Sequence, residues 1–147
     1  MEHGELTMLK PEEILARLDT AILAEIQAVA DYKTHAQAVP GTEIGEALAA
    51  LRDVECEHAL RLAARIAALG GSLPSSQPKV QAAGRTLADW LTFDLTAEQW
   101  AIVEYARLVT GIVDDDETAE LIGELLQDEI RHARWLKSTL REIEDRQ

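Results

Sequence analysis

Cysteine, aromatic residues and basic residues are all scarce in this sequence. Its single cysteine, Cys56, excludes a disulfide within the chain and any metal site built from several cysteines. No apolar run is long enough to cross a bilayer, and the N-terminus lacks the basic region and apolar run of a secretory signal. We therefore expect a cytoplasmic protein with no membrane partner.

The scarcity of basic residues limits the partners that charge could attract. There are 14 Lys and Arg against 27 Asp and Glu, which gives a net charge of −13. Nucleic acids and anionic membranes are therefore not expected as partners, because both would be repelled. The charge could attract cations, although ordinary solubilising charge also explains it. A length of 147 residues predicts a single domain over residues 1–147.

Ala, Leu and Glu, which form helices readily, are abundant, and strand-like alternation is absent. Pro11 suits the first turn of a helix, whereas Pro40-Gly41 and Gly70-Gly71 suit helix ends. The acidic run 114–117 suits another helix N-terminus. These signals predict four helices, at about 11–38, 42–69, 86–113 and 116–144. Two short connections and one longer segment, 72–84, predict an all-α, antiparallel four-helix bundle with a long crossover between the second and third helices.

Ionisable residues interrupt the apolar stripe of each predicted helix. In the stretch DEIRHARWL, Glu129 and His132 lie three residues apart where the stripe should be apolar. The second helix repeats this spacing with Glu55 and His58. A single Glu-x-x-His is a weak motif, but two copies on equivalent apolar stripes are a strong signal that the four residues belong to one functional site.

The first and third helices repeat a second pattern. Glu25 is followed seven residues later by Tyr32, and Glu98 is followed seven residues later by Tyr105. These two glutamates are separated by 73 residues, and the two Glu-x-x-His motifs by 74. The chain therefore consists of two similar helical hairpins that carry the same polar residues in register.

A bound metal pair explains why four carboxylates and two imidazoles would share a buried seam. A buried carboxylate without a partner costs several kcal/mol, and four of them would repel one another. Two divalent cations would offset that cost. Glu and His at positions i and i+3 share a helix face. Carboxylate and imidazole ligands without thiolate suit Fe, Mn or Zn.

This pattern resembles the ferritin-like di-iron carboxylate superfamily, in which two helices supply a Glu each and two supply Glu-x-x-His. The sequence is most similar to the bacterioferritin branch. The matching stretches are EIQAVADYKTH from Glu25, ECEHALRLAARIAALGGSLP from Glu55, DLTAEQWAI from Asp94 and DEIRHARWL from Asp128. The resemblance covers about residues 10–145.

The resemblance implies two Fe per chain, with Mn or Zn as alternatives, and a role for each polar residue. Glu104 competes with Glu98 as the ligand from the third helix, but the DLTAE register favours Glu98. Tyr32 and Tyr105 become candidates for hydrogen bonds to ligating carboxylates; ordinary core tyrosines are the alternative. The implied ligands are the terminal Glu25 and Glu98, the bridging Glu55 and Glu129, and the imidazoles of His58 and His132.

The sequence also departs from the bacterioferritin pattern. Cys56 occupies the position of the family's haem-binding Met, which argues against haem. Ala50 and Val54 are apolar near positions where some bacterioferritins carry inner-surface iron ligands, which argues against mineral storage more than against the metal pair. His35 is expected to be peripheral. The short fifth helix of full-size cages is missing, so a homo-oligomer such as a dimer or a dodecamer is expected.

The leading functional hypothesis is a non-haem di-iron oxidoreductase, a ferroxidase that oxidises Fe(II) with O2 or H2O2 for iron storage or detoxification. The alternatives are a rubrerythrin-like peroxide reductase, an enzyme that oxidises an organic substrate, and a nonredox di-metal bundle that holds Zn. A bundle that binds an unidentified partner also stays open. A DNA-protecting mini-ferritin is disfavoured, because all six expected ligands fit within one chain.

Overall fold

The computed structural model describes residues 8–75 and 77–146. Within these ranges the chain forms no strand and four helices, which are α1 (Pro11–Ala38), α2 (Glu43–Ala68), α3 (Leu87–Gly111) and α4 (Asp116–Asp145). The predicted fold class is confirmed, and each helix end lies within two residues of its predicted position. Residues 1–7, 76 and 147 of the predicted domain lie outside the described ranges. None of the described helices is long and apolar enough to span a membrane.

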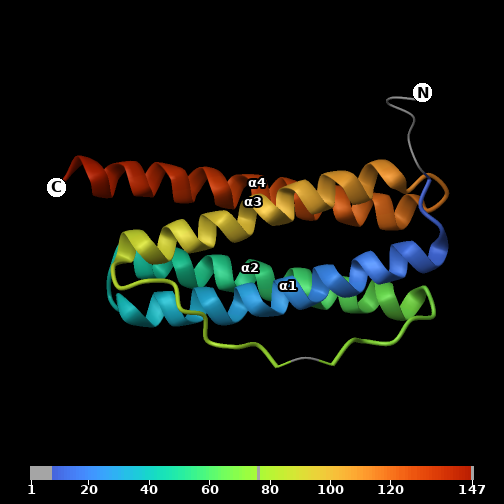
Figure 1. Ribbon diagram of the computed structural model, residues 1–147, viewed down its shortest axis with the longest axis horizontal. Coiled ribbons are helices and arrows are strands. Elements are labelled where there is room, and N and C mark those ends of the chain that lie inside the picture. Colours follow the sequence, from blue (N-terminus) through green and yellow to red (C-terminus); the bar gives the residue numbers. More distant parts are fainter. Residues whose placement is uncertain (1–7, 76, 147) are drawn as a thin grey trace.

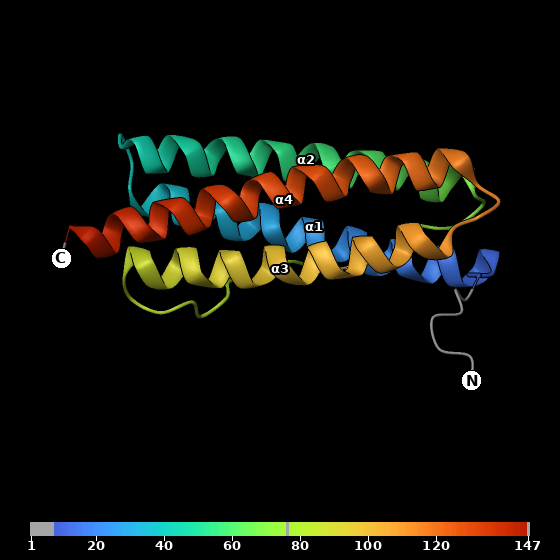
Figure 2. The ribbon, with the colours of Figure 1, turned by 90° about the horizontal axis from the view of Figure 1, so that it is seen from above.

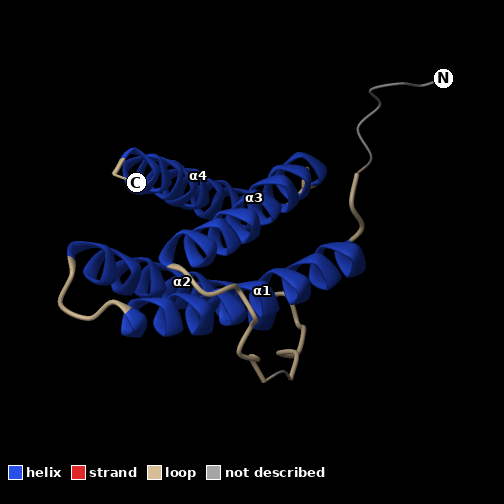
Figure 3. Cartoon of the chain, turned by 60° about the vertical axis from the view of Figure 1, so that its left-hand side comes forward, coloured by secondary structure: helices blue, strands red, loops and turns tan. Residues whose placement is uncertain are grey.

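The four helices form two antiparallel hairpins that pack against each other as two layers (Figure 1 and Figure 3). Helices α1 and α2 form one hairpin, and α3 and α4 form the other. Between the layers, α1 packs on α3 more extensively than α2 packs on α4. The crossover between α2 and α3 runs along the length of the bundle, so that α3 begins at the opposite end (Figure 1). Figure 2 shows the same arrangement from above.

Local capping explains where the helices begin and end. The side chains of Thr42, Thr86 and Asp115 each accept a hydrogen bond from the backbone amide three residues later, which satisfies amides that have no partner within the helix. Gly70 adopts a positive φ of 83° just after α2, a conformation that favours glycine. Helix α3 ends two residues before the predicted position because Ile112 is extended, with φ −92° and ψ 112°.

The core consists of two apolar clusters along the bundle. Tyr105 belongs to the larger cluster and Tyr32 to the smaller. The larger comprises Ile14, Leu18, Ala21, Ile22, Leu62, Ile66, Tyr105, Leu108, Ile112, Leu121, Ile122 and Leu125. The smaller comprises Tyr32, Leu48, Leu91 and Leu136. On every helix, the polar residues that interrupt the apolar stripe lie between residues of the larger cluster and residues of the smaller cluster. These polar residues are themselves buried.

The side chain of Gln27 on α1 holds the crossover against the bundle. Its Nε2 donates to the carbonyl oxygen of Lys79 at 2.6 Å, and its Oε1 accepts from the Lys79 amide at 3.1 Å. The same Nε2 also donates to Asp31 Oδ1 at 3.0 Å. Because Gln27 satisfies both backbone groups of one residue, it fixes the position of the crossover there.

Replacing Gln27 by Leu is therefore expected to loosen the crossover without unfolding the helices. Loss of the two hydrogen bonds to Lys79, each contributing about 0.5–1.5 kcal/mol, should speed amide hydrogen exchange at Lys79 by about 5- to 150-fold. Hydrogen exchange followed by NMR measures this rate. Gln37→Leu, which changes an exposed glutamine of the same helix, is the control. Unchanged exchange at Lys79 in Gln27→Leu would show that other contacts hold the crossover.

Candidate metal centre

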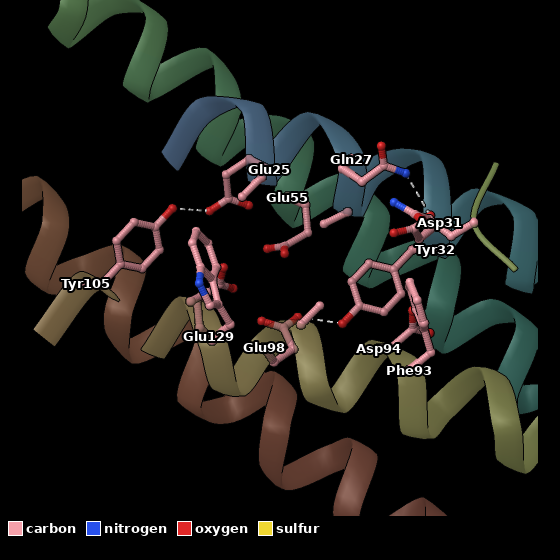
Figure 4. Close-up of a pocket in the computed structure, with 16 residues that line it drawn as sticks. Glu25, Gln27, Asp31, Tyr32, Glu55, Phe93, Asp94, Glu98, Tyr105 and Glu129 are labelled. Carbon is pink, nitrogen blue, oxygen red and sulfur yellow. Dashed lines mark hydrogen bonds between the residues drawn. The ribbon is translucent and has the colours of Figure 1, made fainter. Parts of the chain in front are cut away.

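The six ligands expected from the sequence meet in the middle of the bundle, one or two from each helix. Figure 4 shows the four carboxylates among them, Glu25, Glu55, Glu98 and Glu129. Each is buried, with an exposed fraction between 1% and 6%. Helices α1 and α3 each supply one carboxylate, and α2 and α4 each supply a Glu-x-x-His pair. In chain order, the residues are Glu25, Glu55, His58, Glu98, Glu129 and His132.

The six residues form two overlapping groups of four, and both groups contain Glu55 and Glu129. Within each group, one ligand atom per residue lies within 4.8 Å of all the others. One group adds Glu25 and His58, and the other adds Glu98 and His132. Each group could hold one metal ion, and two ions bound in this way would share the carboxylates of Glu55 and Glu129.

The two imidazoles lie in similar surroundings. His58 Nδ1 is 3.2 Å from Glu25 Oε2, and His132 Nδ1 is 3.2 Å from Glu98 Oε2. Their ring planes differ by 15°, and their centroids are 6.4 Å apart. Burial by itself would lower the pKa of each imidazole, but the surrounding carboxylates outweigh burial and raise both pKa values to about 9.

The two tyrosines expected near the site bridge the hairpins. Tyr32 on α1 donates to Glu98 Oε2 at 2.5 Å, and Tyr105 on α3 donates to Glu25 Oε2 at 2.6 Å (Figure 4). Burial, reinforced by the neighbouring carboxylates, raises the pKa of both phenols well above the usual value. Both tyrosines are therefore protonated donors, and each orients a carboxylate of the other hairpin.

Unsatisfied carboxylate oxygens provide a test of whether cations fit this cluster. Oε1 of Glu25, Glu55 and Glu129 is buried and makes no hydrogen bond of good geometry among the described residues, although an imidazole Nδ1 lies within ion-pair distance of the Glu55 and Glu129 oxygens. Burial and then the neighbouring carboxylates raise the pKa of Glu55 and Glu129 well above the usual value. Such groups are costly in a protein interior, and divalent cations would satisfy them. The oxygen and nitrogen donors present fit Fe, Mn or Zn.

Two other residues considered from the sequence lie outside the cluster. Glu104 has a side chain that is 30% exposed and is 3.7 Å from Arg107 in an ion pair. Cys56 is exposed on α2. The structure thus brings Glu98, rather than Glu104, to the carboxylate cluster.

The structure also reveals buried polar partners that the sequence analysis missed. His35, expected to be peripheral, is only 5% exposed. Its Nδ1 lies 2.7 Å from Asp94 Oδ2, and its ring stacks on Trp90 with centroids 5.9 Å apart. The available signal was spacing, because His35 follows Tyr32 by three residues and Asp94 precedes Glu98 by four. Both spacings direct the side chains inward.

A cavity of about 220 Å³ lies between α1 and α3 and reaches the carboxylate cluster (Figure 4). Gln81 of the crossover and Gln27 contribute polar groups to its lining. Its apolar walls come from Ala24, Ala28, Phe93, Ala97, Trp100 and Ala101. A small neutral molecule could therefore approach the cluster between α1 and α3.

Comparisons with known proteins agree with this architecture. No curated protein matches the sequence. Bacterioferritin BfrA from Mycobacterium tuberculosis has a similar structure, with a TM-score of 0.85 at 22% identity over 95% of this chain and 90% of that chain. A second structure of BfrA from M. tuberculosis gives a TM-score of 0.84 at 22% identity, over 94% and 88% of the respective chains. The resemblance to bacterioferritins is thus confirmed for the fold. The family described as "Ferritin-like domain" matches residues 15–145, and the chain belongs to this family.

Proposed function

We propose that this protein is a di-iron ferroxidase of the bacterioferritin type, which oxidises Fe(II) with O2 or H2O2. One observation carries the proposal: two four-residue donor groups share Glu55 and Glu129 in the core of the bundle. A site of this kind holds two metal ions close enough to reduce one oxidant molecule together. The fold similarity to bacterioferritin BfrA supports the choice of iron.

The proposed reaction moves one electron from each of two Fe(II) ions to a single oxidant molecule. O2 takes up two electrons and two protons to give H2O2, whereas H2O2 takes up two electrons and two protons to give two water molecules. The protein binds the two ions through Glu25, Glu98, the two imidazoles and the two shared carboxylates. Tyr32 and Tyr105 hold the terminal carboxylates in place through their hydroxyl groups.

The cavity between α1 and α3 supports a route for the oxidant. O2 and H2O2 are small and neutral, and the cavity reaches the carboxylate cluster past mostly apolar side chains. The net charge of −13 would favour the approach of Fe(II) to the protein surface. We propose a homo-oligomeric assembly, with storage as a further role only if the assembly encloses mineral.

Replacing Glu98 by Ala tests the proposed function. It removes the α3 carboxylate from one donor group and is expected to slow rapid Fe(II) oxidation by at least about 100-fold, because loss of even an outer-shell partner of a metal ligand typically costs about 10- to 100-fold. Stopped-flow absorbance after mixing metal-free protein with Fe(II) and O2 measures the rate. Glu104→Ala, which changes a glutamate of the same helix outside the cluster, is the control and should retain the parent rate.

The outcomes separate the proposed function from its alternatives. An unaffected rate in Glu98→Ala would contradict the assignment of the site. Faster oxidation with H2O2 than with O2, without iron retention, would favour a peroxide reductase. Metal binding without oxidation by either molecule would favour a nonredox bundle. Retention of far more than two irons per chain would add storage to the ferroxidase activity.

A further inference from the structure

The two halves of the metal centre are alike on the side that faces the carboxylates. Besides the contacts with the terminal glutamates, His58 Nδ1 lies 3.2 Å from Glu55 Oε1, and His132 Nδ1 lies 3.1 Å from Glu129 Oε1. Each imidazole therefore directs Nδ1 towards the carboxylate cluster, and each contacts the glutamate three residues before it.

The two imidazoles differ at the opposite ring nitrogen. His58 Nε2 lies 2.8 Å from Asp128 Oδ2 on α4. Among the described residues, none accepts a hydrogen bond from Nε2 of His132, which makes its hydrogen-bond contact through Nδ1. The side chain of His132 is 7% exposed, compared with 1% for His58. His58 therefore has a polar partner at both ring nitrogens, whereas His132 has one only at Nδ1.

The sequence explains this difference. Asp128 directly precedes Glu129, and the residue that directly precedes Glu55 in the equivalent motif is Val54. The offset of 74 residues that relates the two motifs also relates these positions. A valine side chain cannot accept a hydrogen bond, so the first half lacks the carboxylate that the second half supplies.

A carboxylate at Nε2 affects how an imidazole binds metal at Nδ1. It keeps the ring hydrogen on Nε2 and leaves the Nδ1 lone pair directed at the site. It also fixes the ring orientation and makes the ligating nitrogen a stronger donor. Loss of such a partner typically weakens metal binding by about 10- to 100-fold. The contact between His58 Nε2 and Asp128 Oδ2 meets these conditions, and Arg131 pairs with the other oxygen of the same carboxylate.

We propose that the two metal positions are unequal, so that the position at Glu25 and His58 fills first and retains its metal while the position at Glu98 and His132 fills second and exchanges. Asp128 acts as a positioning residue for the first position. The inference rests on the proposed metal centre and adds that its two positions differ in metal affinity.

Substoichiometric zinc tests the order of filling. Metal-free protein labelled with 15N-histidine is titrated with Zn(II), and NMR follows Nδ1 of His58 and His132, assigned from His58→Asn and His132→Asn. At one Zn(II) per chain, the His58 signal is expected to have shifted almost completely and the His132 signal only slightly. A crystal grown at the same ratio should give its anomalous zinc peak on the His58 side.

Two reciprocal variants, Asp128→Val and Val54→Asp, and one conservative variant, Asp128→Asn, test whether Asp128 causes the preference. Asp128→Val gives both halves a valine and should reduce the preference from about 10- to 100-fold to near unity. The more conservative Asp128→Asn, which keeps an acceptor oxygen, should retain part of the preference. Val54→Asp should raise occupancy at His132 relative to the parent.

The possible results also separate this inference from the proposed function. Filling of both positions in parallel, or of His132 first, overturns the inference while leaving a metal pair intact. An unchanged order in Asp128→Val equally overturns it. Zinc that binds at neither imidazole overturns the metal centre itself.

Discussion

Replacing Glu55 and Glu129 together by Met is expected to give a helical protein that is more stable than the metal-free parent and binds no metal pair. Both carboxylates are 1% exposed, and the buried Oε1 of each makes no hydrogen bond of good geometry among the described residues. Methionine is unbranched and apolar, so it can fill similar space without these costs. Exchanging buried charged groups for apolar ones of similar volume often stabilises a protein by about 1–4 kcal/mol.

The remaining polar residues of the cluster would still have partners in this double variant. His58 Nδ1 keeps Glu25 at 3.2 Å, and His132 Nδ1 keeps Glu98 at 3.2 Å. Each terminal carboxylate also keeps the hydroxyl group of its tyrosine. Removal of the two shared carboxylates therefore leaves two separate Glu–His pairs instead of a crowded cluster of four carboxylates.

Circular dichroism follows the urea unfolding of the chelator-treated proteins and measures the difference in unfolding free energy. Calorimetric titration with Mn(II) or Zn(II) measures metal binding. The matched control replaces Glu57 and Glu120, exposed glutamates of α2 and α4, by Met. It should change stability by no more than about 0.5 kcal/mol and retain binding. A double variant at Glu55 and Glu129 that is less stable than the parent would show that these carboxylates stabilise the metal-free protein.

Much of the fold could be predicted because its signals are local. Pro40-Gly41 and Gly70-Gly71 follow helix ends, and Thr42 and Thr86 cap the next helices. The six cluster residues could also be identified, because a spacing of three or seven residues fixes which side chains share a helix face. The internal repeat then placed the four polar helix faces at equivalent heights in the bundle.

Contacts between helices were harder to predict because they depend on how the hairpins dock. Asp128 and His58 are 70 residues apart in the sequence, and Asp94 and His35 are 59 apart. Spacing places each of these residues near an inward face but does not identify its partner on another helix. The family resemblance likewise made Tyr32 a candidate for a hydrogen bond to a carboxylate, with an ordinary core tyrosine as the alternative, but only the packing of α1 on α3 identifies Glu98 as the acceptor.

The second large effect is expected in the pH dependence of metal binding. The carboxylates near His58 and His132 raise both pKa values to about 9 despite burial. At pH 7 both imidazoles of the metal-free protein therefore carry a proton on the nitrogen that faces the site. A metal ion binds only neutral imidazole, so loading the pair must release these two protons.

The sign of the pH effect follows from this release. Lowering the pH below about 9 favours protonated imidazole and weakens metal binding, by about tenfold per pH unit for each position. Above about pH 9 the two imidazoles are already neutral and contribute no further dependence. Protons held by Glu55 or Glu129, whose pKa values burial and neighbouring carboxylates also raise, would add to the number released.

Calorimetric titration of metal-free protein with Zn(II) at pH 7, in two buffers of different ionisation enthalpy, counts the protons directly. The parent is expected to release at least two protons for two zinc ions, and His132→Asn should release about one fewer. His35→Asn is the matched control, because His35 is buried against Asp94 outside the six-residue cluster, and it should leave the count unchanged. Zinc binding without proton release would mean that the imidazoles are already neutral in the metal-free protein. The carboxylates would then not be holding protons on the two histidines, and metal binding would show no loss of affinity between pH 9 and pH 7.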